Sequence, residues 1–406
     1  MASRFGILSK RLRAISSRGK VIWIHAVSVG EMKAASILAP LLREKFPSHK
    51  IIFSSVTHTG NKVAKTVATP EEEVFYLPFD LSFITNKVVK IIKPELFLCL
   101  ETELWPNLIS SLYRFNAKII LVNGRISNRS YIGYKRIRLI VSRLLRKFSL
   151  ILMQSDEDAA RVLDLGAPKE RIFTVGNLKF DLLLLGPGNR RHEIRDKLGI
   201  AKEEILLVAG STHKGEEDII LDCFLRLKED HKNIKLLLAP RHVERTQEIE
   251  NLLAKFGLES RKYSRDKGPH TKIEDFVRGR QGTRDKVLVL DVIGELKSIY
   301  SAADIVFIGG SLVKKGGQNP IEPAALSRPV IFGKYMFNFR DAAKSFLENK
   351  GAIQIQDKDE LYSSIKLLLD DPAEKKRLGA NAKHTVDKNS GSSQRTIDLI
   401  LPLSIG

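Results

Sequence analysis

Short apolar runs alternate along this chain with longer stretches in which an apolar residue recurs every three or four positions. Runs of β-branched and aliphatic residues separated by helical stretches are typical of βαβ units in a parallel sheet. The repeat length of roughly 25–30 residues is the length expected of such units. The pattern predicts strands within 21–31, 51–57, 75–79, 94–101, 118–124, 150–155, 204–212, 235–241, 286–291, 304–311 and 329–334.

The segment 181–197 interrupts this rhythm with a Gly-Pro-Gly core and a charged flank, which is typical of a linker between domains. We therefore expect an α/β protein of two Rossmann-like domains, residues 1–185 and 186–406, each built on a parallel sheet. Ligands of such sheets bind at the carboxyl ends of the strands, so we expect an active site between the two domains. The polar segment 261–285 predicts an exposed loop, and the last residues of the chain predict helices.

Composition excludes several classes of protein. The 406 residues are 43% hydrophobic and 28% charged, a balance that excludes a disordered or collagen-like chain. The two cysteines, Cys99 and Cys223, lie in apolar stretches, which excludes a disulfide framework or a four-ligand zinc site and suits a reducing compartment. No apolar run approaches the ~18–20 residues of a membrane span, and no signal peptide precedes the first domain. We therefore expect a soluble or peripheral protein.

The net charge of +20 is unevenly distributed. Residues 1–181 contain 29 Lys and Arg against 15 Asp and Glu, and the remainder carries a smaller excess. A basic excess on one domain predicts a polyanionic partner, which can be nucleic acid, an anionic membrane or a phosphorylated lipid.

Two basic segments without acidic residues, 1–20 and 129–148, predict amphipathic helices, and the second favours a face that lies on anionic lipid. In the second segment a single helix would gather its apolar residues largely on one side, namely Ile137, Leu139, Ile140, Leu144 and Leu145. The alternatives are a basic helix that only faces solvent and a nucleic-acid surface, although aromatic residues for base stacking are few.

Acidic residues directly follow two of the predicted strands. Glu31 lies at the start of the helix expected after the first strand, where the helix dipole favours an ionised carboxylate. Glu101 and Glu103 follow the strand within 94–101 and share one face if that strand continues. Lys179 precedes the linker, where its ammonium group can neutralise a phosphate leaving group. The structural alternatives are acids that merely favour a helix start and a lysine that merely faces solvent.

Turns rich in Gly, Ser or Pro follow the predicted strands of the second domain. Backbone N–H groups of such turns can cradle a phosphate, and Glu322 can accept hydrogen bonds from a ribose diol. The motifs of a P-loop, a dinucleotide fingerprint, a paired-histidine metal site and a serine nucleophile elbow are absent from the sequence. The turns are Gly210-Ser211-Thr212, Pro240-Arg241-His242, Gly294-Glu295-Leu296 and 309–323.

Several longer strings of the chain are distinctive, namely WIHAVSVGE, ETELWPN, NGRIS, QSDEDAARVLDLGA, GNLKFD, AGSTHKGEE, APRH, GEL and GGSLVKKGGQNPIEPAAL, followed by PVIFG and FNF. Together they resemble the 3-deoxy-D-manno-oct-2-ulosonic acid (Kdo) transferase family, and the resemblance extends over about residues 21–345. The resemblance implies the GT-B architecture, in which two Rossmann-like domains face each other across a cleft. It also implies inverting transfer of Kdo from CMP-Kdo to a lipid A precursor, with no metal and no cofactor.

The resemblance implies that the catalytic residues lie in the first domain and the donor-binding residues in the second. Glu31 would be the general base, and Glu101 and Lys179 would stabilise the transition state in a first domain that binds the lipid acceptor. The second domain would bind CMP-Kdo. Its binding residues would be Ser211, Pro240, Arg241, Gly294, Glu295, Leu296, Asn319, Pro320, Ile321 and Glu322.

The sequence also departs from the family pattern. The usual apolar N-terminal anchor is missing, so we expect a peripheral hold on the cytoplasmic face of the bacterial inner membrane or a trimmed chain. Lys214 stands where an acid is common, and Gln318 stands where a histidine is common, which affects the expected nucleotide contacts. The alternatives are another two-lobed nucleotide-sugar enzyme, such as an epimerase or a different sugar transferase, and a basic nucleic-acid-binding protein.

Overall fold

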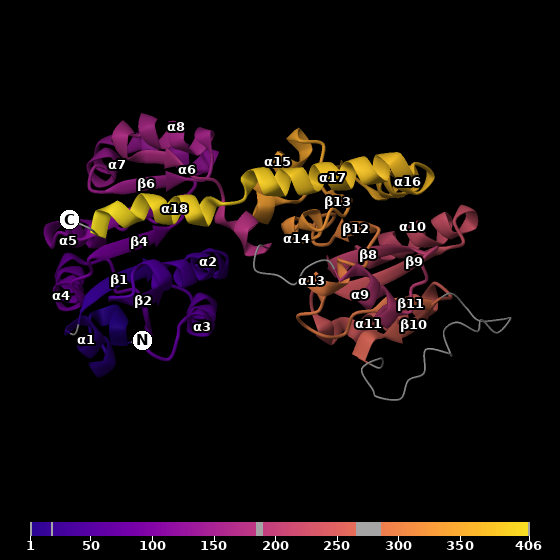
Figure 1. The fold of residues 1–406 in the computed structure, drawn as a ribbon, viewed down its shortest axis with the longest axis horizontal. Helices are drawn as coiled ribbons and strands as arrows, with labels where there is room; N and C mark the ends of the chain where they lie inside the picture. The colour runs from indigo at the N-terminus through magenta and orange to yellow at the C-terminus, as the bar shows by residue number, and fades with distance from the viewer. Residues whose placement is uncertain (1, 18, 184–189, 265–285, 405–406) are drawn as a thin grey trace. The chain divides into compact units, whose positions relative to one another are not determined.

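The computed structural model of the chain describes residues 2–17, 19–183, 190–264 and 286–404, and it divides into two compact units (Figure 1). Unit 1 contains Met1–Leu184 together with Asn389–Gly406, and unit 2 contains Leu185–Lys388. The sequence prediction assigned 389–406 to the second domain, whereas these residues belong to unit 1.

Unit 1 is built on a seven-stranded sheet in the order β3-β2-β1-β4-β5-β6-β7, with all neighbours parallel. The strands are apolar almost throughout because helices cover both faces of a parallel sheet. The strand order reverses between β1 and β4, which is the place where ligands bind to open sheets of this kind. The strands are β1 (Lys20–His25), β2 (His49–Ser55), β3 (Glu73–Tyr76), β4 (Leu96–Leu100), β5 (Lys118–Gly124), β6 (Leu150–Met153) and β7 (Ile172–Thr174).

Two apolar cores lie on the two faces of this sheet. Trp23 and Phe97 point into the core formed with α1, α4, α5, α7 and α8, whereas Ile22 and Leu98 point into the core formed with α2, α3 and α18. The helices of unit 1 are η1 (Ala2–Phe5), α1 (Lys10–Ser17), α2 (Val29–Lys45), α3 (His58–Val67), α4 (Ser82–Ile92), α5 (Pro106–Arg114), α6 (Asn128–Arg136), α7 (Arg138–Leu145), α8 (Asp156–Asp164), η2 (Lys169–Arg171), η3 (Leu178–Leu183), α18 (Ser392–Ile400) and η7 (Leu401–Ser404).

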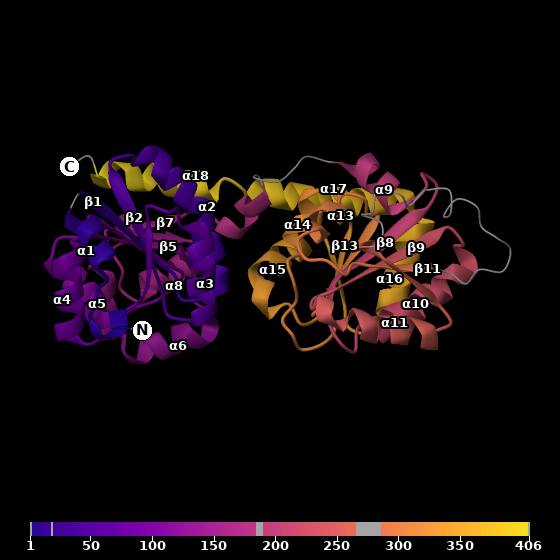
Figure 2. The same ribbon diagram turned by 90° about the horizontal axis from the view of Figure 1, so that it is seen from below.

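The C-terminal helix α18 lies beside α2 in unit 1 (Figure 2). Its start is fixed by the buried carboxylate of Asp181, which accepts hydrogen bonds from the backbone N–H groups of Gly391, at 2.7 Å, and Ser393, at 2.6 Å. The Arg395 guanidinium donates to the carbonyl of Val175. These contacts explain why the last residues belong to a sheet far from them in sequence.

Unit 2 repeats the architecture, with a seven-stranded sheet in the order β10-β11-β9-β8-β12-β13-β14, again parallel throughout. The reversal of strand order lies between β8 and β12. The strands are β8 (Ile205–Thr212), β9 (Ile234–Pro240), β10 (Glu259–Lys262), β11 (Lys286–Val289), β12 (Ile305–Ile308), β13 (Val330–Gly333) and β14 (Ile353–Ile355).

One face of this sheet packs on α10, α11, α16 and the start of α17. The helices of unit 2 are α9 (Arg191–Leu198), α10 (Glu217–Asp230), η4 (Val243–Arg245), α11 (Thr246–Lys255), α13 (Leu296–Ile299), α14 (Ile321–Ala325), η6 (Phe337–Phe339), α15 (Arg340–Glu348), α16 (Lys358–Asp370) and α17 (Pro372–Asn389).

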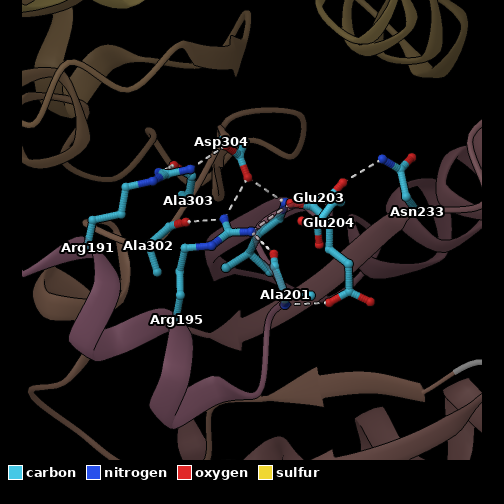
Figure 3. A network of polar contacts seen from close by, with 10 residues as sticks. Arg191, Arg195, Ala201, Glu203, Glu204, Asn233, Ala302, Ala303 and Asp304 are labelled. Carbon is cyan, nitrogen blue, oxygen red and sulfur yellow. Dashed lines mark hydrogen bonds and ion pairs between the residues drawn. The ribbon is translucent and has the colours of Figure 1, made fainter. Parts of the chain in front are cut away.

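A charged network joins α9 to the amino ends of β8 and β12 (Figure 3). The Asp304 carboxylate accepts from Arg191 at 2.5 Å, from Arg195 at 2.9 Å and from the Leu206 backbone N–H at 2.8 Å. The Arg195 guanidinium also donates to three backbone carbonyls. Because this network lies at the ends of the strands opposite to the ligand edge, we assign it to stability rather than to chemistry.

Several elements differ from the sequence prediction. The short strands β7, β10 and β14 were not predicted, because they have three or four residues and are partly polar. The predicted linker 181–197 is shorter than expected, because α9 begins at Arg191. Part of that linker, 184–189, and most of the loop predicted at 261–285 lie outside the described residues.

The two basic segments also differ from the prediction. The segment 129–148 is not one helix but two, α6 and α7, with a break at Ile137. Its apolar residues do not share one side, because Leu144 and Leu145 are buried in the core, whereas Leu139 is 78% exposed. In the segment 1–20, α1 inserts Leu12 into the core of unit 1.

None of the helices within residues 2–17, 19–183, 190–264 and 286–404 is long and apolar enough to cross a bilayer.

Candidate active site

Three glutamates lie at the carboxyl ends of the two strands where the order of sheet 1 reverses. Glu31 is in the first turn of α2, after β1, and Glu101 and Glu103 are in the loop between β4 and α5. The three carboxylates are close enough for the charges of Glu101 and Glu103 to interact with that of Glu31. The structure therefore brings together the acids that the sequence placed after two separate strands.

Glu31 is held by its own helix start. Its carboxylate accepts hydrogen bonds from the Val27 backbone N–H and from the Ser28 hydroxyl, both at 2.7 Å. The Ser28 oxygen in turn accepts from the Glu31 N–H, which makes Ser28 and Glu31 a variant of the capping box in which the carboxylate accepts from the N–H before the N-cap residue. The side chain is only 6% exposed, and burial raises its pKa above the ordinary value, as does the charge of Glu101.

Glu101 turns the chain out of β4 with a left-handed backbone, φ 55°. Such a conformation costs a non-glycine residue on the order of 1–3 kcal/mol and tends to occur at functional sites. The strand ends at Leu100, so the condition under which Glu101 and Glu103 would share one strand face is not met. The Oε1 atom of Glu101 lies 3.8 Å from Nζ of Lys179.

Lys179 comes from the turn after β7, at the start of η3. The preceding residues are fixed by side-chain amides: Asn123 Oδ1 accepts from the Leu178 N–H, and Asn177 Oδ1 accepts from the Lys179 N–H. The structure thus places the one basic residue that the sequence singled out in unit 1 opposite Glu101.

Of the three glutamates, Glu103 has the carboxyl group whose pKa is shifted most. Burial, followed by the charges of Glu31 and Glu101, raises the pKa of its carboxyl group to about 7. The pKa of the nearby Tyr134 hydroxyl is raised by burial and by Glu103. The sequence analysis noted Glu103 but assigned it no role, and the E-x-E spacing was the signal that both acids belong to one site.

In unit 2, a buried glutamate organises the glycine-rich loop after β12. Glu216, fully buried, accepts hydrogen bonds from the backbone N–H groups of Gly310, Ser311 and Leu312 at 2.6–3.0 Å and from that of His213 at 2.9 Å. These N–H groups are therefore not available to a phosphate, contrary to the expectation that the amides of this loop cradle one. The sequence analysis missed Glu216.

Glycines allow the loops of unit 2 to approach one another. A side chain at Gly309 would place its Cβ 2.3 Å from the carbonyl oxygen of Ser211, and Ser211 itself has a left-handed backbone, φ 57°. The Arg241 N–H donates to the Thr212 carbonyl at 2.9 Å, which joins the ends of β8 and β9. Ser211, Pro240 and Arg241 thus lie in neighbouring loops at the carboxyl edge of the sheet, as predicted.

The remaining predicted residues lie at two helix starts in unit 2. Gly294, φ 94°, and Glu295 precede α13, which begins at Leu296. Asn319 and Pro320 precede α14, and the Asn319 side chain bridges the Ile321 N–H and the Glu322 carboxylate, at 3.1 and 3.0 Å.

Within the described ranges, no three His, Cys, Asp or Glu side chains gather in a way that would hold a metal ion.

Comparisons with known proteins complete the description of the site. Residues 1–182 match the family model of the 3-deoxy-D-manno-octulosonic-acid transferase (kdotransferase). A 3-deoxy-D-manno-octulosonic acid transferase of Haemophilus influenzae is 34% identical over 94% of this chain and 86% of its own length. The chain belongs to the Kdo transferase family. It is therefore an enzyme, a glycosyltransferase.

Other relatives of the Kdo transferase agree with this assignment. The 3-deoxy-D-manno-octulosonic acid transferase of Chlamydophila psittaci is 32% identical over 89% of this chain and 80% of its own. Among solved structures, the UDP-GlcNAc 2-epimerase of Neisseria meningitidis matches 94% of this chain and all of its own, with a TM-score of 0.64 at 11% identity. That likeness shows the fold alone, and it confirms the predicted α/β, GT-B-type architecture of two Rossmann-like domains.

Proposed function

We propose that this Kdo transferase moves Kdo from CMP-Kdo to a lipid A precursor, lipid IV-A, with inversion and without a metal ion, as a step of lipopolysaccharide core biosynthesis. The observation that carries the proposal is the group of three glutamates at the carboxyl ends of β1 and β4, in which Glu31 and Glu103 have raised pKa values. Membership of the family supports Kdo as the sugar that is transferred, and in this proposal the acidic group provides the proton acceptor that the transfer needs.

Inversion requires a single displacement. A hydroxyl oxygen of the lipid attacks the anomeric carbon of Kdo, the bond from that carbon to the phosphate oxygen breaks, and CMP leaves with the electron pair. The hydroxyl proton passes to a general base. Glu31 is the base in this proposal, because burial makes its carboxylate more basic than that of an exposed glutamate, and its capping box holds it in one position.

Glu101 and Lys179 assist at the reacting sugar. Sugar transfer passes through an oxocarbenium-like transition state, whose positive charge a carboxylate stabilises. We assign that carboxylate to Glu101 and propose that its ion pair with the Lys179 ammonium group, 3.8 Å away, holds it in position. The second unit binds the donor. Its binding residues in this proposal are Ser211, Pro240, Arg241, Gly294, Glu295, Leu296, Asn319, Pro320, Ile321 and Glu322.

The direct test of this activity uses the full chain with tetraacyl lipid A precursor and freshly generated CMP-Kdo. The expected result is a lipid product heavier by one or more Kdo units, together with stoichiometric CMP, both in the presence and in the absence of a chelator. An unchanged lipid mass would contradict the proposal. Protection against thermal unfolding by UDP but not by CMP would point instead to another nucleotide-sugar enzyme.

We also propose that unit 1 lies on the cytoplasmic face of the bacterial inner membrane as a peripheral protein, since the acceptor is a lipid. The exposed Ile137, Leu139 and Ile140 at the junction of α6 and α7 lie among exposed cations, including Arg136 and Arg143. Exposed apolar side chains surrounded by cations are the pattern of proteins that bind anionic lipid surfaces.

Vesicle co-sedimentation tests this surface. Leu139→Ser combined with Arg143→Glu is expected to weaken binding to anionic vesicles strongly, because both side chains are exposed and neither change disturbs the core. The effect should be larger at low salt, where surface charges are less screened. If the double variant binds vesicles as well as the wild type does, this face of unit 1 does not contact the membrane.

A further inference from the structure

A group of nitrogen-bearing side chains surrounds His213 in unit 2. His213 follows β8, Arg241 and His242 follow β9, and Lys315 lies in the loop after β12, so three neighbouring strands contribute to the group. The rings of His213 and His242 meet edge to face with centroids 5.9 Å apart. A Cβ at Gly310 would lie 3.1 Å from the His213 ring and 3.5 Å from the Lys315 side chain.

The positive charges in this group are not neutralised by the protein. Within the described part of the chain, neither Arg241 nor Lys315 forms an ion pair. Two other cations nearby in sequence are paired: Lys214, which follows His213, contacts Glu248, and Arg245, four residues after Arg241, contacts Glu217. A cluster of unpaired cations is expected to bind an anion.

His213 also has an unused polar atom. Its Nε2 is buried and has no hydrogen-bond partner among the described residues. A buried nitrogen without a partner is costly, and each such atom in a native structure calls for an explanation such as a missing ligand. The carboxylate of Glu216 does not supply that partner, because it accepts from the His213 backbone and from three N–H groups of the glycine loop.

The hydrogen bonds of the same glycine loop show whether its backbone can bind a phosphate. The N–H groups of Gly309, Gly317 and Gln318 donate to backbone carbonyls, and those of 310–312 donate to Glu216. Most backbone N–H groups of this loop therefore already have acceptors within the protein, and an anion bound here must be held by side chains. The Asn338 side chain fixes the Lys315 carbonyl from the other side of the loop, which holds Lys315 near the histidines.

We propose that the His213 ring donates a hydrogen bond from Nε2 to the phosphate of the cytidylate donor, with Arg241, His242 and Lys315 supplying the counter-charge. This inference rests on the proposed function, and it assigns the phosphate to side chains rather than to a glycine cradle. His213, His242 and Lys315 thereby become donor-binding residues.

The binding is expected to depend on pH. Burial, followed by the charges of His242, Lys315, Arg241 and Arg245, lowers the pKa of His213 below its ordinary value. A phosphate beside the ring opposes that effect, so the pKa rises on binding and the complex takes up protons. Affinity for CMP should therefore increase as the pH falls from 8 to 6.5. The Glu216 carboxylate contacts His213 through the backbone N–H.

The test is calorimetric titration of the full chain with CMP and with cytidine. His213→Asn should weaken CMP binding at least tenfold and reduce its pH dependence, and it should leave cytidine binding unchanged because cytidine has no phosphate. His384→Asn, at an exposed position of α17, is the matched control and should bind as the wild type does. Lys315→Gln, also exposed, should weaken CMP binding without affecting the fold.

The outcomes separate the inference from the proposed function. If the wild type binds CMP and His213→Asn and Lys315→Gln bind it equally well, the phosphate assignment is overturned and the proposed function stands. Unchanged CMP affinity with a raised KM for CMP-Kdo would place these residues at the sugar carboxylate and would also overturn the assignment. If the wild type does not bind CMP at all, both proposals fail.

Discussion

Glu31 and Glu216 occupy equivalent places in the two units of this Kdo transferase. Each follows a glycine, and each lies at the start of the helix that comes after the first central strand of its sheet, β1 or β8. Both side chains are buried. Topology and burial therefore do not distinguish them.

Their partners do distinguish them. Glu216 accepts four backbone N–H groups, three of them from a loop about a hundred residues further along the chain, so it serves to hold two loops together. Glu31 accepts one N–H and one hydroxyl from its own turn, and its neighbours in space are two other acids. Burial raises the pKa of both carboxyl groups, so the difference lies in their neighbours: backbone donors surround Glu216, as expected of a structural carboxylate, whereas other acids lie near Glu31, as expected of a functional site.

The largest effect on the comparison is expected from Glu216→Ala. The change leaves four N–H groups without their acceptor, and each buried donor left unsatisfied costs about 1–3 kcal/mol, so the free energy of unfolding of unit 2 should fall by about 3 kcal/mol or more. Urea denaturation measures this loss. Glu244→Ala, at an exposed position of the same unit, should leave stability nearly unchanged. Equal urea midpoints for Glu216→Ala and Glu244→Ala would contradict the structural role of Glu216.

A smaller effect of opposite sign is expected from Glu103→Gln. The folded pKa of about 7 lies above the unfolded value, so wild-type stability falls as the pH rises from about 4.5 to 7 and stays lower above it. Replacing the group should therefore raise stability at pH 8, on the order of 1 kcal/mol after allowance for solvent screening, and should change nothing at pH 4. Thermal unfolding at the two pH values provides the measurement. A variant less stable than the wild type at pH 8 would show that Glu103 is held by favourable contacts instead.

The smallest effect on stability is expected from Ser28→Ala. Loss of the N-cap costs about 1 kcal/mol, and loss of the hydroxyl that donates to Glu31 raises the pKa of that carboxyl group further. The acid limb of kcat/KM should consequently shift to higher pH. Ser36→Ala, on the exposed side of the same helix, is the control and should leave the limb in place. If the acid limb of the kcat/KM profile is not shifted in Ser28→Ala, ionisation of Glu31 does not control the rate.

Much of the fold could be predicted because its central strands are continuous apolar runs bounded by turns. The edge strands β7, β10 and β14 escaped prediction, since strands that are covered on fewer sides need fewer apolar residues. Residues 389–406 were assigned to the second domain because nothing in their helical pattern reveals that Asp181 binds the start of α18.

The candidate site was predictable to the same extent. Glu31 and Glu101 were found because acids that follow apolar strands stand out in the sequence. Glu216 was missed because three of its four partners lie 94–96 residues away. The left-handed backbone of Glu101 could not be predicted, because glutamate rarely adopts that conformation. Local sequence pattern thus locates acids at the ligand edge of a sheet, whereas the long-range hydrogen bonds that fix a residue such as Glu216 leave no local pattern.

The most direct test of the account is the turnover of Glu31→Gln at saturating donor and acceptor, with Glu44→Gln on the exposed side of the same helix as control. Glutamine preserves the capping box, so the variant should fold and bind CMP as the wild type does. Removal of the base should lower kcat by about 10²–10⁴, and the control should be unaffected. Glu31→Gln turning over at the wild-type rate would contradict the account, because the proton acceptor would then be another group.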